Sequence, residues 1–205
     1  MRRLTLIREL LAGMVESASA LTIGLTDESQ FTGSMTTLDF ESGVVNGPNM
    51  TFESGSWIIS GSSIGPAHSG QYVLAESYPY TSGPDNLATF TNGVYQVGLW
   101  FGNDEAWANP FNATLRAYNS SDALIGSTSI AANRNDRHDQ FLGLASDELI
   151  YKVVLDYGAA SSQLWGSIDD FSYGGDPIGV PVPAPAWQAW LVCADGRAGN
   201  SFYIT

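Results

Sequence analysis

Cysteine is almost absent from this 205-residue chain, which has a single thiol at Cys193. One thiol cannot form an intramolecular disulfide, and it cannot build a zinc site from several cysteines. The two histidines, His68 and His138, lie too far apart in the sequence to form a His-x-x-x-His pair, so a catalytic zinc is not indicated. The sequence also lacks the fingerprints of serine hydrolases, phosphate-binding loops and dinucleotide-binding folds.

Basic side chains are scarce as well. Lysine and arginine together number 8 against 21 acidic residues, which gives a formal net charge of −13. The imbalance lies in the body of the chain, because residues 21–175 carry only four basic side chains. An acidic surface of this kind repels the phosphates of nucleic acids, so we expect no nucleic-acid partner. It favours solubility and is compatible with divalent cations.

The sequence contains no apolar run long enough to cross a bilayer. The apolar stretch near the C-terminus, residues 186–194, is far shorter than the roughly 20 residues that a spanning helix needs. We therefore expect no membrane span in this chain.

The N-terminus has the parts of a secretory signal peptide. Arg2 and Arg3 give it a positive start, residues 10–15 are apolar, and residues 18–20 read Ala-Ser-Ala, the small-x-small pattern that signal peptidase accepts. Charged residues also interrupt the apolar run, so a short amphipathic helix is the alternative. We expect residues 1–20 to be a signal peptide that directs export.

Residues typical of short strands and tight turns are abundant. The chain is 44% hydrophobic, 12% aromatic and only 14% charged, and it contains 22 glycines. Its apolar residues recur with a period of two, as where Leu149, Tyr151 and Val153 share one face and Lys152 takes the other. The predicted strands are residues 37–41, 50–53, 56–60, 71–76, 94–101, 112–118, 123–130, 139–144, 149–157 and 164–173. We expect an all-β fold, an antiparallel β-sandwich of jelly-roll type with about nine or ten strands.

The strand pattern also predicts the domain boundaries. Residues 36–174 form the predicted sandwich and residues 21–35 lead into it. Residues 175–205 form a linker and tail, because the prolines from Pro177 to Pro185 cannot join a sheet and favour an extended chain.

Two sets of motifs resemble a known family. The tail segment VPVPAPAW, residues 180–187, resembles the start of the C-terminal sorting signal of PEP-CTERM proteins, which are exported bacterial proteins. It lacks the glutamate of that motif, the full apolar helix and the terminal arginine cluster, so the signal is degenerate or truncated. The body segments TLDFE, VGLWFGN, ATLRAY and IDDFSYG resemble the extracellular jelly-roll domain common in that family, which is similar to carbohydrate-binding modules. The resemblance implies a secreted or cell-surface protein.

Asp169 and Asp170, in the closing IDDFSYG segment, are the first candidates for chemistry. Successive side chains of a strand point to opposite faces, so the two carboxylates are not expected to flank one glycosidic bond as a catalytic pair. Asp169 shares the parity of Phe171 and Tyr173 and is therefore expected to point inward, where a carboxylate needs a partner.

The family resemblance implies what that partner could be. In jelly-roll carbohydrate-binding modules the first and last strands often contribute carboxylates to a structural calcium ion. By this resemblance Glu41 and Asp169 are the expected ligands, with Asp39 and Asp170 as further candidates, and backbone carbonyls would complete the six to eight oxygens. The alternative is an aspartate that accepts hydrogen bonds from turn amides.

Tryptophans and a polar loop form a candidate sugar site. Trp100 lies opposite the apolar parity of its strand, and Trp107 lies in the loop that follows. Asn103 and Asp104, in the same loop, could hydrogen-bond sugar hydroxyls while a ring supports the apolar face of a pyranose. Core packing of the rings and a solvated turn are the alternatives.

Together these features predict an exported, non-enzymatic β-sandwich at the cell surface or in the extracellular matrix, binding extracellular polysaccharide. The first alternative is a purely structural or adhesive matrix protein without a small ligand. A polysaccharide hydrolase or lyase is less favoured, because no pair of acids and no His/Tyr/Arg cluster is expected to converge.

Overall fold

The structure is a computed structural model that describes residues 20–53, 55–75, 85–102, 104–158, 160, 164 and 166–179. The predicted signal peptide up to residue 19, Asn103 and the tail from residue 180 lie outside the described residues. The described strands are β1 (Thr22–Leu25), β2 (Met35–Leu38), β3 (Met50–Phe52), β4 (Trp57–Ser60), β5 (Tyr72–Ala75), β6 (Asp85–Gly102), β7 (Asn112–Tyr118), β8 (Leu124–Ala131), β9 (Gln140–Asp156) and β10 (Ser167–Gly174). Two short helical turns accompany them, a 3-10 turn at Glu28–Gln30 and α1 at Gly61–Ile64.

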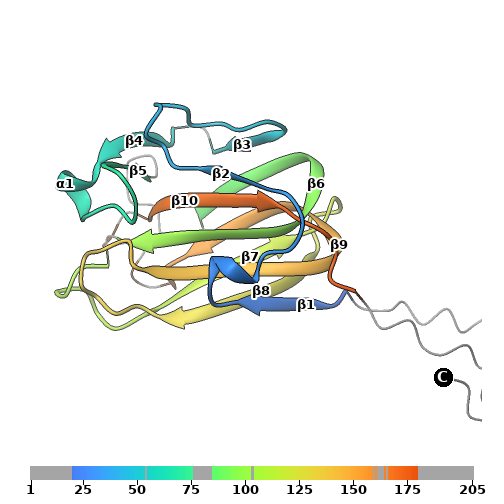
Figure 1. Cartoon of the computed structure of the whole chain (residues 1–205). Coiled ribbons are helices and arrows are strands. Elements are labelled where there is room, and N and C mark those ends of the chain that lie inside the picture. Colours follow the sequence, from blue (N-terminus) through green and yellow to red (C-terminus); the bar gives the residue numbers. More distant parts are fainter. Residues whose placement is uncertain are drawn as a thin grey trace, which may run out of the picture.

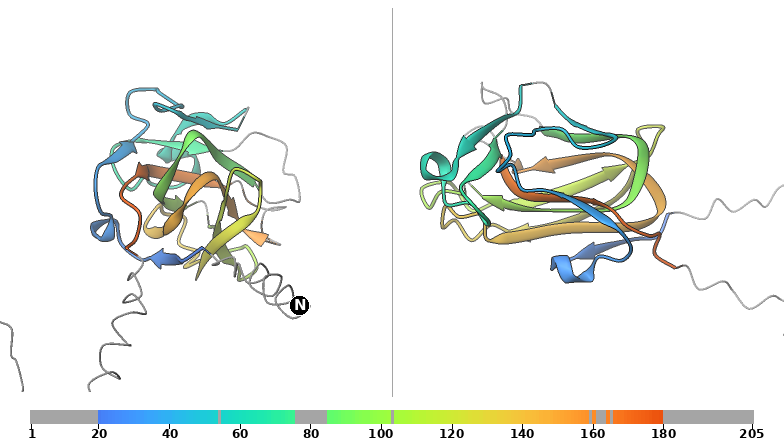
Figure 2. Two further views of the ribbon diagram at one scale, coloured as in Figure 1. Left: turned by 90° about the vertical axis from the view of Figure 1, so that its right-hand side faces the viewer. Right: turned by 45° about the horizontal axis from the view of Figure 1, so that its top comes forward.

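All ten strands pair in antiparallel fashion. The order is β4-β5-β10-β6-β9-β7-β8, with β1 on β9, β2 on β10 and β3 on β6. The long strands β6 and β9 pair with different neighbours along their lengths, because β6 changes from β3 to β10 and β9 from β1 to β7. Seen along the strands, the sheet folds around a central core (Figure 2). The predicted all-β antiparallel sandwich of jelly-roll type is confirmed.

Alternation places the core as expected. In β7, Ala113, Leu115 and Ala117 are buried and the residues between them are not. Opposite them, Val153 and Leu155 of β9 are buried in the same cluster. Because a side chain on one face of each strand meets the equivalent face of its neighbours, the period-two pattern determines the core residues of β7 and of the part of β9 that pairs with it.

Two strand segments were not predicted. β1 lies in the stretch expected to lead into the sandwich, and it pairs with β9 from Thr22–Ser146 to Leu25–Gly143. The first half of β6 was also missed, because it is rich in residues that favour turns. Its register against β9 shifts between Thr89 and Val94, around a glycine at a φ of 67°, Gly93.

A β-bulge in β10 corrects the expected direction of Asp169. The register against β6 slips between Asp169 and Ser172, and Asp170 adopts a φ of 44°. Ile168 before the bulge and Phe171 after it both lie in the main core. Asp169 therefore points to the opposite face of the sheet, beside its cross-strand partner Trp100, and not into the main core.

The two ends of the sandwich differ. The start of β1 and the end of β10 lie together at one end, on the right in Figure 1, whereas α1 and the loop before β9 lie at the other. Hydrogen bonds join the segment before β2 to the segment after β10: Gly175 N–H donates to the Ser34 carbonyl and Asp176 N–H to the Thr32 carbonyl. We call the end that carries α1 the loop end. In the part of the chain that the structure describes, no helix is long and apolar enough to cross a membrane.

Candidate functional site

One loop, residues 65–71, connects α1 to β5 at the loop end, and we call it the rim loop. Two carboxylates that are far apart in the sequence hold it, one just after β2 and one in β10. Glu41, just after β2, accepts the N–H groups of Gln71 and Tyr72 on Oε1, both at 2.7 Å. Asp169 accepts the Ser69 N–H on Oδ2 at 2.9 Å. The structure thus brings Glu41 and Asp169 to the same loop.

The bulge makes the two neighbouring aspartates converge, contrary to the expected alternation. While Asp169 accepts the Ser69 N–H, Asp170 Oδ1 accepts the Ser69 hydroxyl at 2.9 Å. The other oxygen of Asp169 accepts the Asp170 N–H at 2.8 Å. Asp169 has no exposed surface, so it cannot touch a substrate. The convergence therefore holds the rim loop and does not form an acid–base pair.

Burial controls the protonation of this group. It raises the pKa of the Asp169 carboxyl to about 7, against the lowering effect of the Ser69 N–H. Burial also raises the pKa of Asp170, which the Ser69 hydroxyl opposes. A carboxyl that titrates near neutrality and holds a loop makes that contact sensitive to pH.

Three of the four predicted calcium ligands, Glu41, Asp169 and Asp170, share this loop as a partner. Asp39 is exposed, and its Oδ1 accepts the Glu41 N–H at 3.1 Å. Within the described ranges, no three His, Cys, Asp or Glu side chains gather as a metal-binding group. Both oxygens of Asp169 and Oε1 of Glu41 already accept backbone N–H groups, so the donor set does not fit an ion that needs six to eight oxygens. The calcium ion stays a prediction of the resemblance, and these contacts argue against it.

Trp100 is half-buried on the outer face of β6. His68 of the rim loop stacks on it, with ring centroids 3.6 Å apart and an angle of 8° between the planes. Phe141 packs edge-on against it at 5.5 Å. The indole N–H of Trp100 is buried and has no hydrogen-bond partner among the described residues. His68 therefore covers the ring that the sequence suggested as a sugar platform.

The other predicted sugar-binding residues have different surroundings. Trp107 is 63% exposed. Asp104 is buried, and its two oxygens accept the N–H groups of Arg134 at 2.7 Å and Asp136 at 3.1 Å. Burial raises the pKa of Asp104. Asp104 thus fixes the loop before β9, while Trp107 presents its ring to solvent.

His138 is buried and connects two parts of the fold, a role that its sequence position did not predict. Its Nε2 lies 2.8 Å from the Ser167 hydroxyl and its Nδ1 lies 3.0 Å from the Pro66 carbonyl. Burial lowers the pKa of this imidazole to about 4. Since both ring nitrogens are occupied, His138 joins the rim loop to β10 and is not available to a ligand.

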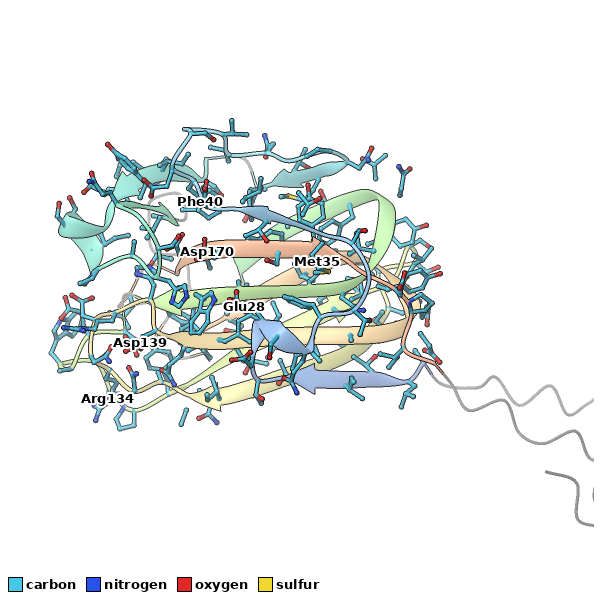
Figure 3. The ribbon with its side chains drawn as sticks, viewed as in Figure 1. Glu28, Met35, Phe40, Arg134, Asp139 and Asp170 are labelled. Carbon is cyan, nitrogen blue, oxygen red and sulfur yellow. The ribbon has the colours of Figure 1, made fainter. Side chains whose placement is uncertain are left out.

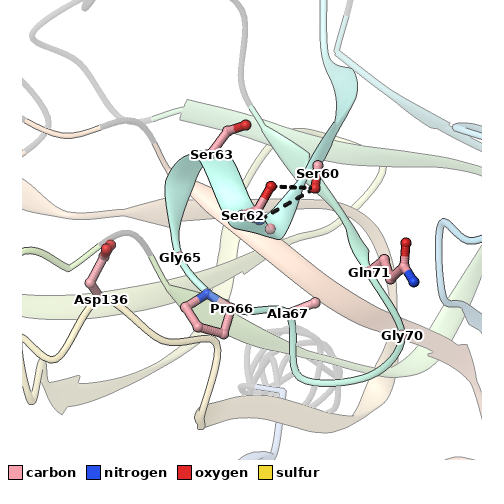
Figure 4. Close-up of a pocket in the computed structure, with 10 residues that line it drawn as sticks. Ser60, Ser62, Ser63, Gly65, Pro66, Ala67, Gly70, Gln71 and Asp136 are labelled. Carbon is pink, nitrogen blue, oxygen red and sulfur yellow. Dashed lines mark hydrogen bonds between the residues drawn. The ribbon is translucent and has the colours of Figure 1, made fainter.

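An open pocket of about 630 Å³ lies between α1, the rim loop and the loop before β9. Its polar lining comes from Ser60, Ser62, Ser63, Gln71 and Asp136 (Figure 4). The Ser60 and Ser62 hydroxyls bond to each other at 2.9 Å. The side chains of Ser63, Gln71 and Asp136 have no hydrogen bond within the described part of the chain. Asp136 is half-buried, with its Oδ1 enclosed, so the pocket offers a ligand Ser63, Gln71 and the exposed part of this carboxylate.

Gly65 explains why this pocket has its shape. It has a φ of 113°, and a Cβ there would lie 2.3 Å from the Asp136 carbonyl oxygen. Only glycine allows the rim loop to pass this close to the loop before β9. The one signal in the sequence was the run of glycines and serines from residue 60 to residue 70, which predicts turns but not a cavity.

The arrangement of the strands places the pocket at the loop end of the sandwich. Arg134 and Asp139, in the loop before β9, lie at the loop end in Figure 3, and Asp136 lies between them in the sequence. The start of β1 and the end of β10 lie at the other end. The pocket and Trp107 thus belong to the loops of an antiparallel β-sandwich protein, a class in which such loops commonly carry function.

Comparison with known proteins identifies no family for this chain. No protein-family model matches the chain, and no curated protein matches it. Among solved structures, the N-terminal CBM22-1–CBM22-2 tandem domain of Xyn10C from Paenibacillus barcinonensis gives a TM-score of 0.44 at 12% identity, over 77% of this chain and 51% of that chain. This chain thus spans about half the length of the tandem domain.

Two further solved structures resemble the fold less closely. TmCBM61, in complex with β-1,4-galactotriose, gives a TM-score of 0.31 at 18% identity, over 67% of this chain and 94% of that chain. The K2 cleaved adhesin domain of Lys-gingipain gives 0.29 at 11% identity, over 76% and 98%. At these scores no ligand and no activity can be transferred to this chain.

Proposed function

We propose that this protein is an exported, non-enzymatic β-sandwich that binds polysaccharide at the cell surface or in the extracellular matrix, through its loop end. The main observation behind this proposal is the open pocket. Three of its polar side chains have no hydrogen-bond partner among the described residues: Ser63, Gln71 and Asp136. A hydroxyl, an amide and a carboxylate are the groups that recognise sugar hydroxyls by hydrogen bonding.

Trp107 supports the proposal as an exposed aromatic ring of the same end. Its neighbour Ala108 accepts a hydrogen bond from Arg134 Nη1 at 2.9 Å. Arg134 and Asp136 in turn donate their N–H groups to Asp104. This chain of contacts links the loop of Trp107 to a residue that lines the pocket, so a glycan in the pocket has a ring within the same group of loops.

The position of the pocket suits a tethered protein. The start of β1 and the end of β10 lie at the opposite end (Figure 1). Export through residues 1–20 and sorting through the segment at residues 180–187 complete the proposal; the first rests on the signal-peptide pattern of the N-terminus and the second on the sequence resemblance. A domain held from that end presents the loop end to its surroundings.

The non-enzymatic part of the proposal rests on the groups that could do chemistry. Asp169 is fully buried, and His138 uses both ring nitrogens inside the fold. A glycosidase needs two carboxyl groups that flank the bond to be cleaved. The convergence of Asp169 and Asp170 on Ser69 does not supply such a pair to the solvent.

Retention on insoluble polysaccharides, together with a glycan array, tests this function. We expect the wild-type chain to be retained on at least one polysaccharide, and Gln71→Ala and Trp107→Ala to weaken retention. Leu124→Ala, which removes a side chain that is 56% exposed on β8, is the matched control and should bind as the wild type does. If the wild-type chain is retained on none, the proposal is wrong and the structural or adhesive alternative takes its place.

A further inference from the structure

Asp136 is the one charged side chain among the described residues that line the pocket. Its Oδ1 is buried and has no hydrogen-bond partner among the described residues. The ion pairs of the described chain, Arg116–Asp156 and Lys152–Asp122, involve other residues. The pocket therefore contains a carboxylate whose charge no described cation neutralises.

The backbone holds Asp136 in a fixed position. It adopts a φ of 59°, in the left-handed region, and its N–H donates to Asp104 Oδ1 at 3.1 Å. Gly65 of the rim loop packs directly against its carbonyl. A strained residue that its neighbours hold in place is set before any ligand arrives, which lowers the entropic cost of binding.

The surroundings of Asp136 are more acidic than basic. Asp104 and Glu105 lie close enough to raise its pKa together with its burial. One guanidinium of that loop, that of Arg134, is directed to the Ala108 carbonyl. A negative potential in a pocket attracts cations and repels anions.

We propose that the pocket selects glycans that carry a protonated amino group, such as polymers of hexosamine, and rejects uronic acid polymers. This inference rests on the proposed function and specifies its ligand. The ammonium group lies against the carboxylate of Asp136, while neighbouring sugar hydroxyls bond to Ser63 and Gln71. A hydrogen bond between two charged groups is stronger than one between neutral groups, so the amine determines the preference.

Calorimetric titration with two oligosaccharides of equal length tests the inference. One is built of glucosamine and the other of N-acetylglucosamine, so they differ in the charge of the nitrogen. The titrations use about 0.15 M salt, where charges more than about 8 Å apart are largely screened. We expect the wild-type chain to bind the glucosamine oligomer more tightly, and Asp136→Asn to reduce that affinity about tenfold, the change expected from the loss of one charged hydrogen bond.

A charge-matched control separates the pocket from the general acidity of the protein. Glu53→Gln removes one negative charge from an exposed residue next to β3 and should leave the affinity for the glucosamine oligomer unchanged. An equal loss in both variants would overturn the inference, because the amine would then respond to net charge alone. Equal binding of the two oligomers, unaffected by Asp136→Asn, would overturn the inference and leave the proposed function in place. Failure of the wild-type chain to bind any glycan would overturn both.

Discussion

Glu41 and Asp169 hold the rim loop on the two sides of one glycine, Gly70. Asp169 accepts the N–H of Ser69 on one side of this glycine, and Glu41 accepts the N–H of Gln71 on the other. Two carboxylates that are far apart in the chain thus fix the rim loop on both sides of Gly70. The loop forms a wall of the pocket, so stability and binding are coupled through these carboxylates.

Substituting Gly70 tests this coupling. A Cβ at Gly70 would lie 2.3 Å from Glu41 Oε1, and the residue has a φ of 57°. We expect Gly70→Ala to lower the free energy of unfolding, because it strains the backbone and displaces Glu41 from its two amides. Gly158→Ala is the control, since Gly158 has a φ of 58° with nothing near its missing Cβ.

The difference between these two variants isolates the Glu41 contact. We expect Gly70→Ala to be the less stable by about 1–3 kcal/mol, the range for leaving a polar group without its partner. Urea unfolding of both proteins measures it. Equal stabilities would show that Glu41 contributes nothing through the rim loop.

The stability of the fold should depend on pH through Asp169. Its pKa is about 7 in the folded chain, above its ordinary value of 3.8. A carboxyl with a raised pKa stabilises the fold most when it is protonated, so its contribution decreases as the pH rises from about 4 through 7. The slope is at most about 1.4 kcal/mol per pH unit. Asp169→Asn should remove this decrease in a series of urea unfolding curves, and an unchanged pH dependence would contradict it.

His138 should act in the opposite direction. Its pKa is lowered to about 4 from 6.5, so its contribution is complete above pH 6.5 and is lost as the pH falls through 4. In Asp169→Asn the stability should therefore rise from about pH 4 to pH 6.5. His138→Gln should remove that rise. If adding His138→Gln to Asp169→Asn leaves that rise in place, His138 does not control it.

Calcium can be tested by melting the protein with and without a chelator. A bound ion stabilises the folded state by mass action, so a calcium site would give a higher melting temperature in calcium than in EDTA. Because the oxygens of Glu41 and Asp169 are already bonded to amides, we expect equal melting temperatures. A higher value in calcium that disappears in Glu41→Gln would establish the ion that the resemblance implied.

Asp104 should control the order of the loop before β9. Its carboxylate accepts the N–H groups of Arg134 and Asp136. We expect Asp104→Ala to cost about 2 kcal/mol of folding free energy and to speed trypsin cleavage after Arg134 and Arg137, because two N–H groups lose their acceptor. Asp104→Asn keeps one acceptor oxygen and should fall between Asp104→Ala and the wild-type chain. Unchanged cleavage in Asp104→Ala would show that the loop is held by other contacts.

The alternation of side chains was sufficient to predict most of the sandwich. It gave β7 its observed bounds and placed Leu115 and Val153 in the core, because burial of one face leaves a period of two in the sequence. It did not show that the two predicted segments of β9 form one strand, or that β6 begins before residue 94. Register shifts interrupt the period of two in both strands. β1 is too short, and its neighbours too polar, to give a pattern of its own.

The site was harder to predict because it depends on exceptions to that period. The bulge at Asp169 and Asp170 has no glycine or proline to announce it, and it reversed the expected face of Asp169. Nothing in the sequence places Glu41 and Asp169 on one loop, or Gly65 against Asp136. Such contacts depend on how loops meet in space, and loops carry no periodic signal.

The two borders of the described sandwich meet at one place in the fold. Leu21 N–H donates to the Asp147 side chain and the Asp147 N–H donates to the Leu21 carbonyl, while Ile178 N–H donates to the carbonyl of the adjacent Ser146. A mechanical pull between the chain before residue 21 and the chain after residue 178 would therefore load the hydrogen bonds at this point of β9 first. The aromatic core and the loop end lie off the path of the force, so the pocket keeps its geometry until these few hydrogen bonds have broken.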